Sequence, residues 1–257
     1  MNLRACRFGE LLRNVPLGGA LFRLDFAWAG PPPRGGQFFL IRPKRSGVFL
    51  GRPISARWEP AAGVVQFFIA KRGRGTEELA AMRIGEEAEL TGPLGNSWED
   101  CLSPREKRGP VALIGGGIGF APLAAFAPEL PEDSYDCYAG FKTLSAKGYR
   151  RLLGLFLYSR RLWIATEDGS AGRKGLVTGF LDPAEYSAVC ACGPEPMLAV
   201  VAASCKKAGT PCFISLERRM ACGVGACLGC TVKTARGNRR CCADGPVFNA
   251  EEIVFGE

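Results

Sequence analysis

The sequence predicts a multidomain fold of three parts: an N-terminal antiparallel β-barrel, a central parallel α/β domain and a small C-terminal module built around cysteines. Residues 1–102 hold short alternating apolar segments separated by glycine and proline, a pattern typical of small barrels. Residues 103–210 alternate apolar strands with helical stretches, which favours a parallel sheet. Residues 211–257 are rich in cysteine and glycine and form the third part.

Within the first part, apolar and polar side chains alternate in several short segments. Turns rich in glycine and proline, at 31–36 and 92–96, separate them. Strands this short and this frequently interrupted favour a closed antiparallel barrel. The expected strands are 21–26, 37–41, 63–70 and 85–91.

The central part begins after a polar stretch at 103–110, which is a plausible linker. A buried strand is expected at 111–114, followed by a helix that starts near Pro122. Strands and helices then alternate, which predicts a parallel sheet with ligands at its carboxyl edge. The further expected elements are strands at 135–139, 162–165 and 188–192 and a helix at 196–209.

Composition limits the possible chemistry. The chain has 257 residues, 47% of them hydrophobic and 23% charged, which suits a soluble protein with packed cores. It contains no histidine, which excludes histidine acid–base catalysis, histidine-ligated zinc and Rieske-type ligation. The formal net charge is +8, but arginine and lysine are dispersed rather than gathered in one tract. We therefore expect no nucleic-acid partner.

An uncharged stretch at 109–128 is long enough to suggest a membrane span. Its glycines and prolines would break a lipid-facing helix, so a buried strand, a turn and a helix explain it better, and we expect no membrane segment. The first residues lack the apolar core of a signal peptide. Twelve cysteines without an export signal favour metal binding in the cytoplasm over a disulfide framework.

The most informative motif is the cysteine pattern near the C-terminus. Cys222, Cys227 and Cys230 have the spacing C-x4-C-x2-C in a glycine-rich loop, which is the spacing of plant-type [2Fe–2S] proteins. The fourth thiolate is Cys241 or Cys242, and the spacing does not choose between these neighbours. Structural zinc is the rival, but zinc sites usually pair two C-x2-C knuckles and this chain has one.

Two motifs of the first part have the chemistry to bind an anionic, aromatic ligand. Arg52-Pro53-Ile54-Ser55 offers a guanidinium and a hydroxyl on an extended backbone. Alone, this tetrapeptide is more typical of an accidental turn. Its place before the turn that contains Gly75-Thr76, whose backbone N–H groups could meet a pyrophosphate, favours a binding role.

Two further motifs follow expected strands of the central part. Gly115, Gly116, Gly117 and Gly119 form a glycine turn before a helix, where phosphates can approach the backbone. The usual dinucleotide fingerprint G-x-G-x-x-G fails because Phe120 occupies its last position. Cys192-Gly193-Pro194 ends the strand at 188–192, so Cys192 is either near a nicotinamide ring or a small buried side chain.

The order of barrel, α/β domain and cysteine module resembles the ferredoxin–NADP reductase superfamily. A finer resemblance is to the electron-transfer subunits of type 1B dihydroorotate dehydrogenase (the PyrK family). It rests on the motifs above, on Ser215 to Cys227 and on Cys242 to Phe248. The resemblance implies that Cys222, Cys227, Cys230 and Cys242 hold the cluster, with Cys242 as the fourth ligand. It also implies an FAD site and a nicotinamide site, formed by Arg52, Pro53, Ile54, Ser55, Phe68, Ile69, Ala70, Gly75 and Thr76, and by Gly115, Gly116, Gly117, Gly119, Cys192, Gly193 and Pro194.

The sequence departs from this family in two places. The family usually carries an aromatic–basic pair where this chain has Ile69-Ala70, and Lys71 is the nearest replacement for the missing charge. The turn after Gly95 reads Asn96-Ser97-Trp98 where Asn-Gly-Phe is common.

The resemblance implies a relay in which a catalytic partner oxidises dihydroorotate on its own FMN. Electrons then pass singly through the [2Fe–2S] cluster to FAD, and as hydride to NAD rather than NADP, in a heterotetramer of two plus two subunits. Two alternatives stay open. One is the small flavin/iron–sulfur subunit of another NAD(P)H-linked oxidoreductase, of the ferredoxin:NADP or sulfide type. The other is a zinc-stapled binding module without catalytic activity.

Overall fold

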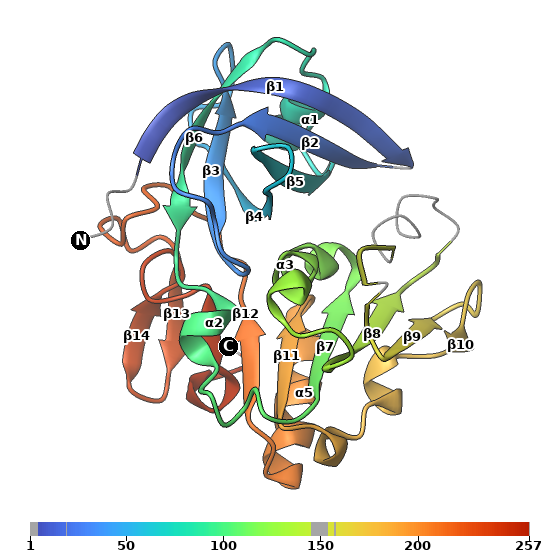
Figure 1. Ribbon diagram of the computed structural model, residues 1–257. Coiled ribbons are helices and arrows are strands. Elements are labelled where there is room, and N and C mark those ends of the chain that lie inside the picture. The colour runs from blue at the N-terminus through green and yellow to red at the C-terminus, as the bar shows by residue number, and fades with distance from the viewer. Residues whose placement is uncertain (1–4, 19, 145–153, 157, 257) are drawn as a thin grey trace.

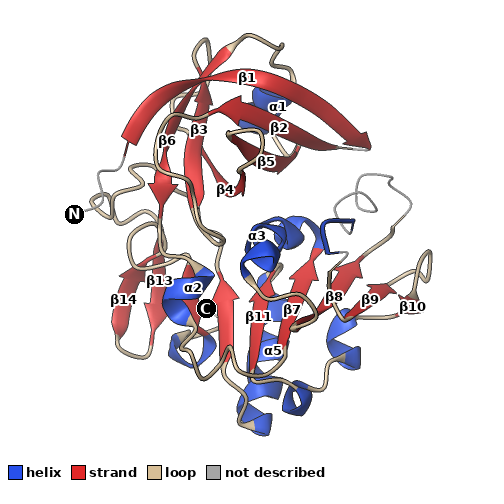
Figure 2. Ribbon diagram, viewed as in Figure 1, coloured by secondary structure: helices blue, strands red, loops and turns tan. Residues whose placement is uncertain are grey.

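The computed structural model describes residues 5–18, 20–144, 154–156 and 158–256 and confirms the predicted fold class. A β-barrel lies above a sheet flanked by helices, and a small hairpin module lies beside the sheet (Figure 1). Most of the helical structure surrounds the sheet, whereas the barrel carries one short helix (Figure 2). No helix in the described part of the chain combines the length and the apolar character needed to cross a lipid bilayer.

The barrel is closed and antiparallel, with strand order β1-β2-β5-β4-β3-β6. Its core contains aromatic side chains in edge-to-face contact, including Phe39 and Phe67 with ring centroids 5.6 Å apart. The motif at 52–55 forms the first half of β4. The elements are β1 (Ala5–Gly18), β2 (Leu21–Ala27), β3 (Phe38–Pro43), β4 (Arg52–Glu59), β5 (Val64–Ala70), α1 (Arg74–Ala80) and β6 (Glu87–Leu94).

The central sheet has seven strands in the order β10-β9-β8-β7-β11-β12-β15, all parallel except for the antiparallel edge strand β15. Alternate residues of β7 face opposite layers: Val111 and Leu113 pack with α3, whereas Ala112 and Ile114 pack with α5. The elements are β7 (Val111–Gly116), α3 (Phe120–Phe126), β8 (Tyr135–Phe141), β9 (Arg161–Thr166), β10 (Arg173–Lys174), β11 (Ala188–Cys192), α5 (Glu195–Ala208), β12 (Cys212–Ser215) and β15 (Val247–Asn249).

The C-terminal module consists of the cysteine loop at 222–230 and the hairpin of β13 (Thr231–Thr234) and β14 (Gly237–Arg240). Although the predicted third segment starts at residue 211, its strands β12 and β15 belong to the central sheet. The module is therefore continuous with that sheet. The predicted boundaries 1–102, 103–210 and 211–257 stay predictions.

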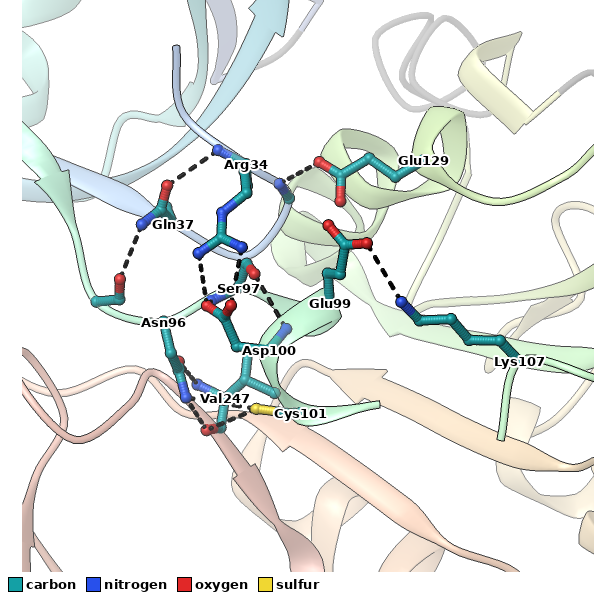
Figure 3. Close-up of polar contacts among 12 residues, drawn as sticks. Arg34, Gln37, Asn96, Ser97, Glu99, Asp100, Cys101, Lys107, Glu129 and Val247 are labelled. Atoms are coloured by element: carbon teal, nitrogen blue, oxygen red, sulfur yellow. Dashed lines mark hydrogen bonds and ion pairs between the residues drawn. The ribbon is translucent and has the colours of Figure 1, made fainter. Parts of the chain in front are cut away.

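The segment after β6 fastens the barrel to the other two parts (Figure 3). Ser97 accepts a hydrogen bond from the Asp100 N–H and caps α2 (Trp98–Cys101), and the Asp100 carboxylate accepts one from the Ser97 N–H. Trp98 is fully buried and stacks on Phe126 of α3, with ring centroids 6.0 Å apart. The unusual Ser97-Trp98 pair thus serves as a helix cap and a packing anchor.

Candidate functional site

A cleft of about 760 Å³ lies between the barrel, the carboxyl edge of the sheet and the segment 215–220. Residues from all three parts of the chain line it, as expected for a ligand site at the carboxyl ends of parallel strands. Most of the residues predicted to bind cofactor meet there. Those from the prediction are Arg52, Pro53, Ile54, Ser55, Phe68, Ile69, Ala70, Thr76 and Cys192.

Arg52 brings a buried donor without a partner to this cleft. Its Nη2 donates to the Leu50 carbonyl at 3.0 Å, but its Nε is buried and has no partner. A buried donor without an acceptor costs about 1–3 kcal/mol, so an anion beside Arg52 would be stabilised. Gly75 makes room for this side chain, because a Cβ at Gly75 would collide with the guanidinium.

A second cleft of about 520 Å³ shares Arg52, Arg72 and Thr76 with the first and is lined further by Arg74 and by Phe49, which is 88% exposed. Three guanidinium groups on one concave surface favour a polyanion such as a pyrophosphate.

The turn at the start of α1 is held by Thr76, whose hydroxyl donates to the Gly73 carbonyl and accepts from the Arg72 N–H, each at 2.9 Å. Lys71 does not line either cleft described here. Its Nζ lies 5.0 Å from the centre of the Phe22 ring, and Arg72 is the basic residue that lines both clefts.

The glycine turn after β7 packs against the end of β11. A Cβ at Gly119 would meet the Cys192 backbone, and one at Gly116 would meet Pro194 and Met197. Gly117 differs, since it has a φ of +55° and open space where a Cβ would stand. The turn therefore joins two strand ends closely and leaves its backbone accessible at Gly117.

Cys192 lines the larger cleft and is 1% exposed. Burial raises the pKa of its thiol, with Glu217 adding to the effect, so the group stays protonated at neutral pH. A neutral thiol at this place offers a small, polarisable contact to a planar ring and no charge.

The predicted cluster cysteines form two pairs. The Cys227 N–H donates to the Cys222 sulfur and the Cys242 N–H donates to the Cys230 sulfur, both at 3.4 Å. Within the described residues, no group of three or more Cys, His, Asp or Glu side chains is arranged to hold a single metal ion.

Backbone N–H groups point at the sulfurs of the loop. Cys222 accepts hydrogen bonds from the Val224 and Cys227 N–H groups, both at 3.4 Å, and these bonds lower the pKa of its thiol to about 6. Gly225, with a φ of +81°, donates to the Cys242 sulfur at 3.1 Å. Such donors stabilise thiolates, the form that binds iron.

The adjacent cysteines Cys241 and Cys242 point in different directions. Cys242 accepts from Gly225 in the loop, whereas the Cys241 thiol donates to the Leu216 carbonyl at 3.0 Å. Burial raises the pKa of Cys241 to about 12. Cys241 is therefore a protonated core thiol turned toward the sheet.

The segment 215–220 connects the cleft with the cysteine loop. Met220 lines the cleft and stands two residues before Cys222. The loop also rests on the barrel, because a Cβ at Gly223 would meet the side chains of Leu40 and Leu94, each at 2.9 Å. Cleft and loop are thus neighbouring parts of one packed unit.

Several residues that line the clefts belong to none of the predicted binding residues. Their positions follow no strand or helix period, and the available signal was their adjacency to recognised motifs in the sequence. They are Phe49, Arg72, Arg74 and the run Ser215, Leu216, Glu217, Arg218, Arg219 and Met220.

Comparison with known proteins agrees with this architecture. A family model for the iron–sulfur cluster binding domain of dihydroorotate dehydrogenase B matches residues 217–254. A relative from Clostridium perfringens, "Dihydroorotate dehydrogenase B (NAD(+)), electron transfer subunit", is 42% identical over 251 residues, which are 96% of this chain and 97% of the relative. The protein of the same name from Clostridium acetobutylicum is 41% identical over 224 residues, covering 87% of each chain.

Among solved structures, that of an NADH-dependent reduced ferredoxin-NADP oxidoreductase aligns with a TM-score of 0.77 at 26% identity. The alignment covers 99% of this chain and 91% of that one. A ferredoxin reductase of carbazole 1,9a-dioxygenase aligns with a TM-score of 0.66 at 22% identity, over 80% of this chain and 67% of that one, and shares the fold. The predicted resemblance is confirmed: the chain belongs to the family of dihydroorotate dehydrogenase B electron transfer subunits, within the ferredoxin–NADP reductase fold.

Proposed function

We propose that this chain transfers electrons from a dihydroorotate-oxidising catalytic subunit to NAD+. One observation carries the proposal: the segment 215–220 joins a cleft that contains the unpartnered Nε of Arg52 to a loop of three cluster-type cysteines that Cys242 faces. The relatives at 41–42% identity, which are named as NAD+-linked electron transfer subunits, support it.

We assign FAD to the two connected clefts. Arg52 and Arg72 would hold its phosphates, and the unpartnered Nε of Arg52 fits an anionic oxygen. Phe68 and Ala70, on one face of β5, form an apolar wall against which a ring system can lie, whereas the Ile69 side chain between them packs in the barrel core. When bound, FAD supplies the exchange between one-electron and two-electron transfer.

We assign the nicotinamide cofactor to the carboxyl edge of the sheet. The open backbone at Gly117 suits a phosphate, and Cys192 would meet the nicotinamide ring as a neutral thiol. Gly115, Gly116, Gly119, Gly193 and Pro194 shape this edge by close backbone packing. None of these groups exchanges a proton in the reaction, which agrees with a chain that has no histidine.

We assign the cluster to Cys222, Cys227, Cys230 and Cys242. Two pairs of thiols suit two irons, one pair for each, better than a single zinc ion. When bound, the cluster supplies one-electron transfer. The N–H groups of Val224, Gly225 and Cys227 hold the thiolates and favour the added negative charge of the reduced form.

The chain acts as a subunit, so it has a catalytic partner. We propose an FMN-containing partner, a complex of two plus two subunits and a cytoplasmic location, where thiols stay reduced. The mass of the co-expressed complex in sedimentation tests the stoichiometry; a stable one-plus-one complex would contradict it.

The experiment that tests the function starts from chain purified under anaerobic conditions. We expect bound FAD and two irons per chain, bleaching of the flavin by NADH, and reduction of NAD+ by dihydroorotate once the catalytic subunit is added. A colourless chain containing zinc would contradict the proposal in favour of a binding module. Electron transfer from reduced ferredoxin instead of dihydroorotate would favour the second candidate, to which the structure at a TM-score of 0.77 points.

A further inference from the structure

Arg240, at the end of β14, lies against the cysteine loop. A Cβ at Gly225 would come within 3.5 Å of the Arg240 Nη1, and Gly225 donates its N–H to the Cys242 sulfur. One glycine residue therefore separates this guanidinium from a sulfur assigned to the cluster.

Asp244 fixes the orientation of Arg240. Its carboxylate accepts from Nε at 2.9 Å, from Nη2 at 3.0 Å and from the Arg240 backbone N–H at 2.7 Å. These bonds engage the side of the guanidinium away from Nη1, which faces Gly225. The pair thus forms a dipole whose positive end is turned toward the loop.

We propose that Arg240 raises the reduction potential of the cluster and that Asp244 acts as a positioning residue that aims it. The inference rests on the proposed function, because it assumes a cluster at Cys222, Cys227, Cys230 and Cys242. Reduction adds one negative charge to the cluster, and a nearby fixed cation stabilises that charge. Arginine suits this task because its guanidinium stays protonated at every physiological pH.

The geometry favours an effect of Arg240 on the reduction potential of the cluster over a purely structural role for this side chain. The Arg240 side chain is 41% exposed, so it fills little of the core, whereas Asp244 is 17% exposed. Arg240 Nη1 faces Gly225, whose N–H donates to the Cys242 sulfur, so the guanidinium lies beside the loop rather than in the core. The neighbouring Arg239 is exposed and pairs with Val232, on the other face of the hairpin.

The test is a redox titration of the full-length chain, followed by the electron paramagnetic resonance signal of the reduced cluster. We compare Arg240→Gln, Arg240→Lys and the matched control Arg239→Gln, each with its iron content measured. At a fixed ambient potential, Arg240→Gln should lower the ratio of reduced to oxidised cluster roughly tenfold, allowing for partial solvent screening. For a one-electron couple, that is a potential lower by about 59 mV.

Arg240→Lys keeps the positive charge, and Arg239→Gln removes a positive charge at the other face of the hairpin. In both variants the ratio of reduced to oxidised cluster should therefore stay within about twofold of that in the unmodified chain. Equal potentials for Arg240→Gln and the unmodified chain would overturn the inference, as would an equally large shift in Arg240→Lys. Should Arg240→Gln lose iron, Arg240→Met replaces it in the titration, because it keeps the apolar stem over Gly225. We expect the same lowering of the reduction potential in Arg240→Met. An unmodified chain that holds no iron would instead overturn the proposed function.

Discussion

Asn96 and Val247 are joined by a pair of hydrogen bonds across 151 positions of the sequence (Figure 3). The Asn96 Nδ2 donates to the Val247 carbonyl at 2.8 Å, and the Val247 N–H donates to Asn96 Oδ1 at 3.0 Å. The backbone N–H of Asn96 also donates to the Gly245 carbonyl at 2.7 Å. Because Asn96 follows β6 and Val247 begins β15, this one side chain fixes the barrel to the sheet edge beside the cysteine loop.

Replacing Asn96 by alanine should therefore loosen this junction. Both bonds to Val247 are lost and its N–H loses the Asn96 acceptor, although its carbonyl still accepts from the Cys101 thiol. We therefore expect the free energy of unfolding to fall by about 1–3 kcal/mol. Urea denaturation measures this. Asn238→Ala, on the exposed hairpin, is the control and should change stability by less than about 0.5 kcal/mol. Equal stability of the two variants would contradict the role of Asn96.

Replacing Gly75 by alanine should weaken flavin binding. A Cβ at Gly75 would collide with the Arg52 guanidinium, so Gly75→Ala should displace Arg52 and lower FAD occupancy at least about tenfold. Gly73→Ala is a matched control in the same turn, because Gly73 has an extended backbone with a φ of 164° and open space for a Cβ. Flavin content after purification, measured by absorbance, checks both. Similar losses in the two variants would show that the turn, not Arg52, matters.

The two adjacent cysteines should respond differently to substitution by serine. Cys242→Ser should remove a cluster ligand and leave little [2Fe–2S] absorbance. Cys241→Ser should retain the cluster, since the Cys241 thiol donates to the Leu216 carbonyl rather than facing the loop. Iron and sulfide analysis of both variants checks this, and cluster loss confined to Cys241→Ser would reverse the assignment.

The buried carboxylate of Asp136 should make the stability of the fold depend on pH. Its side chain is fully buried, and burial raises its pKa, but hydrogen bonds from Arg160, Arg161 and Tyr186 outweigh this effect and lower the pKa to about 2. The pKa in the folded chain is thus below the ordinary value of 3.8. The ionised carboxylate therefore stabilises the fold above that value by about 2 kcal/mol, and this contribution is lost as the pH falls toward 2.

Asp136→Asn should lack this contribution at neutral pH. Its free energy of unfolding should fall less steeply than that of the unmodified chain between about pH 5 and pH 3. Far-ultraviolet circular dichroism during urea unfolding at each pH measures the difference. Parallel curves for the two proteins would contradict the account.

The sequence was a good guide wherever a single period dominates. The strands expected at 63–70 and 111–114 are β5 (Val64–Ala70) and β7 (Val111–Gly116). β1 was not predicted, because its register against β2 shifts between Leu11 and Arg13 and between Pro16 and Gly18, which interrupts the alternation. β12 and β15 were assigned to the cysteine module because they follow its composition, although pairing places them in the central sheet.

The candidate site could be predicted where the residue types of a motif indicate a chemical role, as at Arg52 and at the cysteines. It was not predictable where long-range packing decides orientation. Arg72 rather than Lys71 lines both clefts because the Lys71 ammonium packs on Phe22. The different directions of Cys241 and Cys242 likewise depend on Leu216 and Gly225, which are distant in sequence.

The most direct test of the account is the rate of NAD+ reduction by dihydroorotate in the complex with the catalytic subunit, compared between the unmodified chain and Cys227→Ser. NADH-dependent reduction of a soluble dye serves as a control that FAD and its nicotinamide site remain intact. We expect Cys227→Ser to keep the dye reaction and to lose at least about a hundredfold in the rate of the dihydroorotate reaction, because the one-electron path is broken. An undiminished dihydroorotate reaction in Cys227→Ser would contradict it.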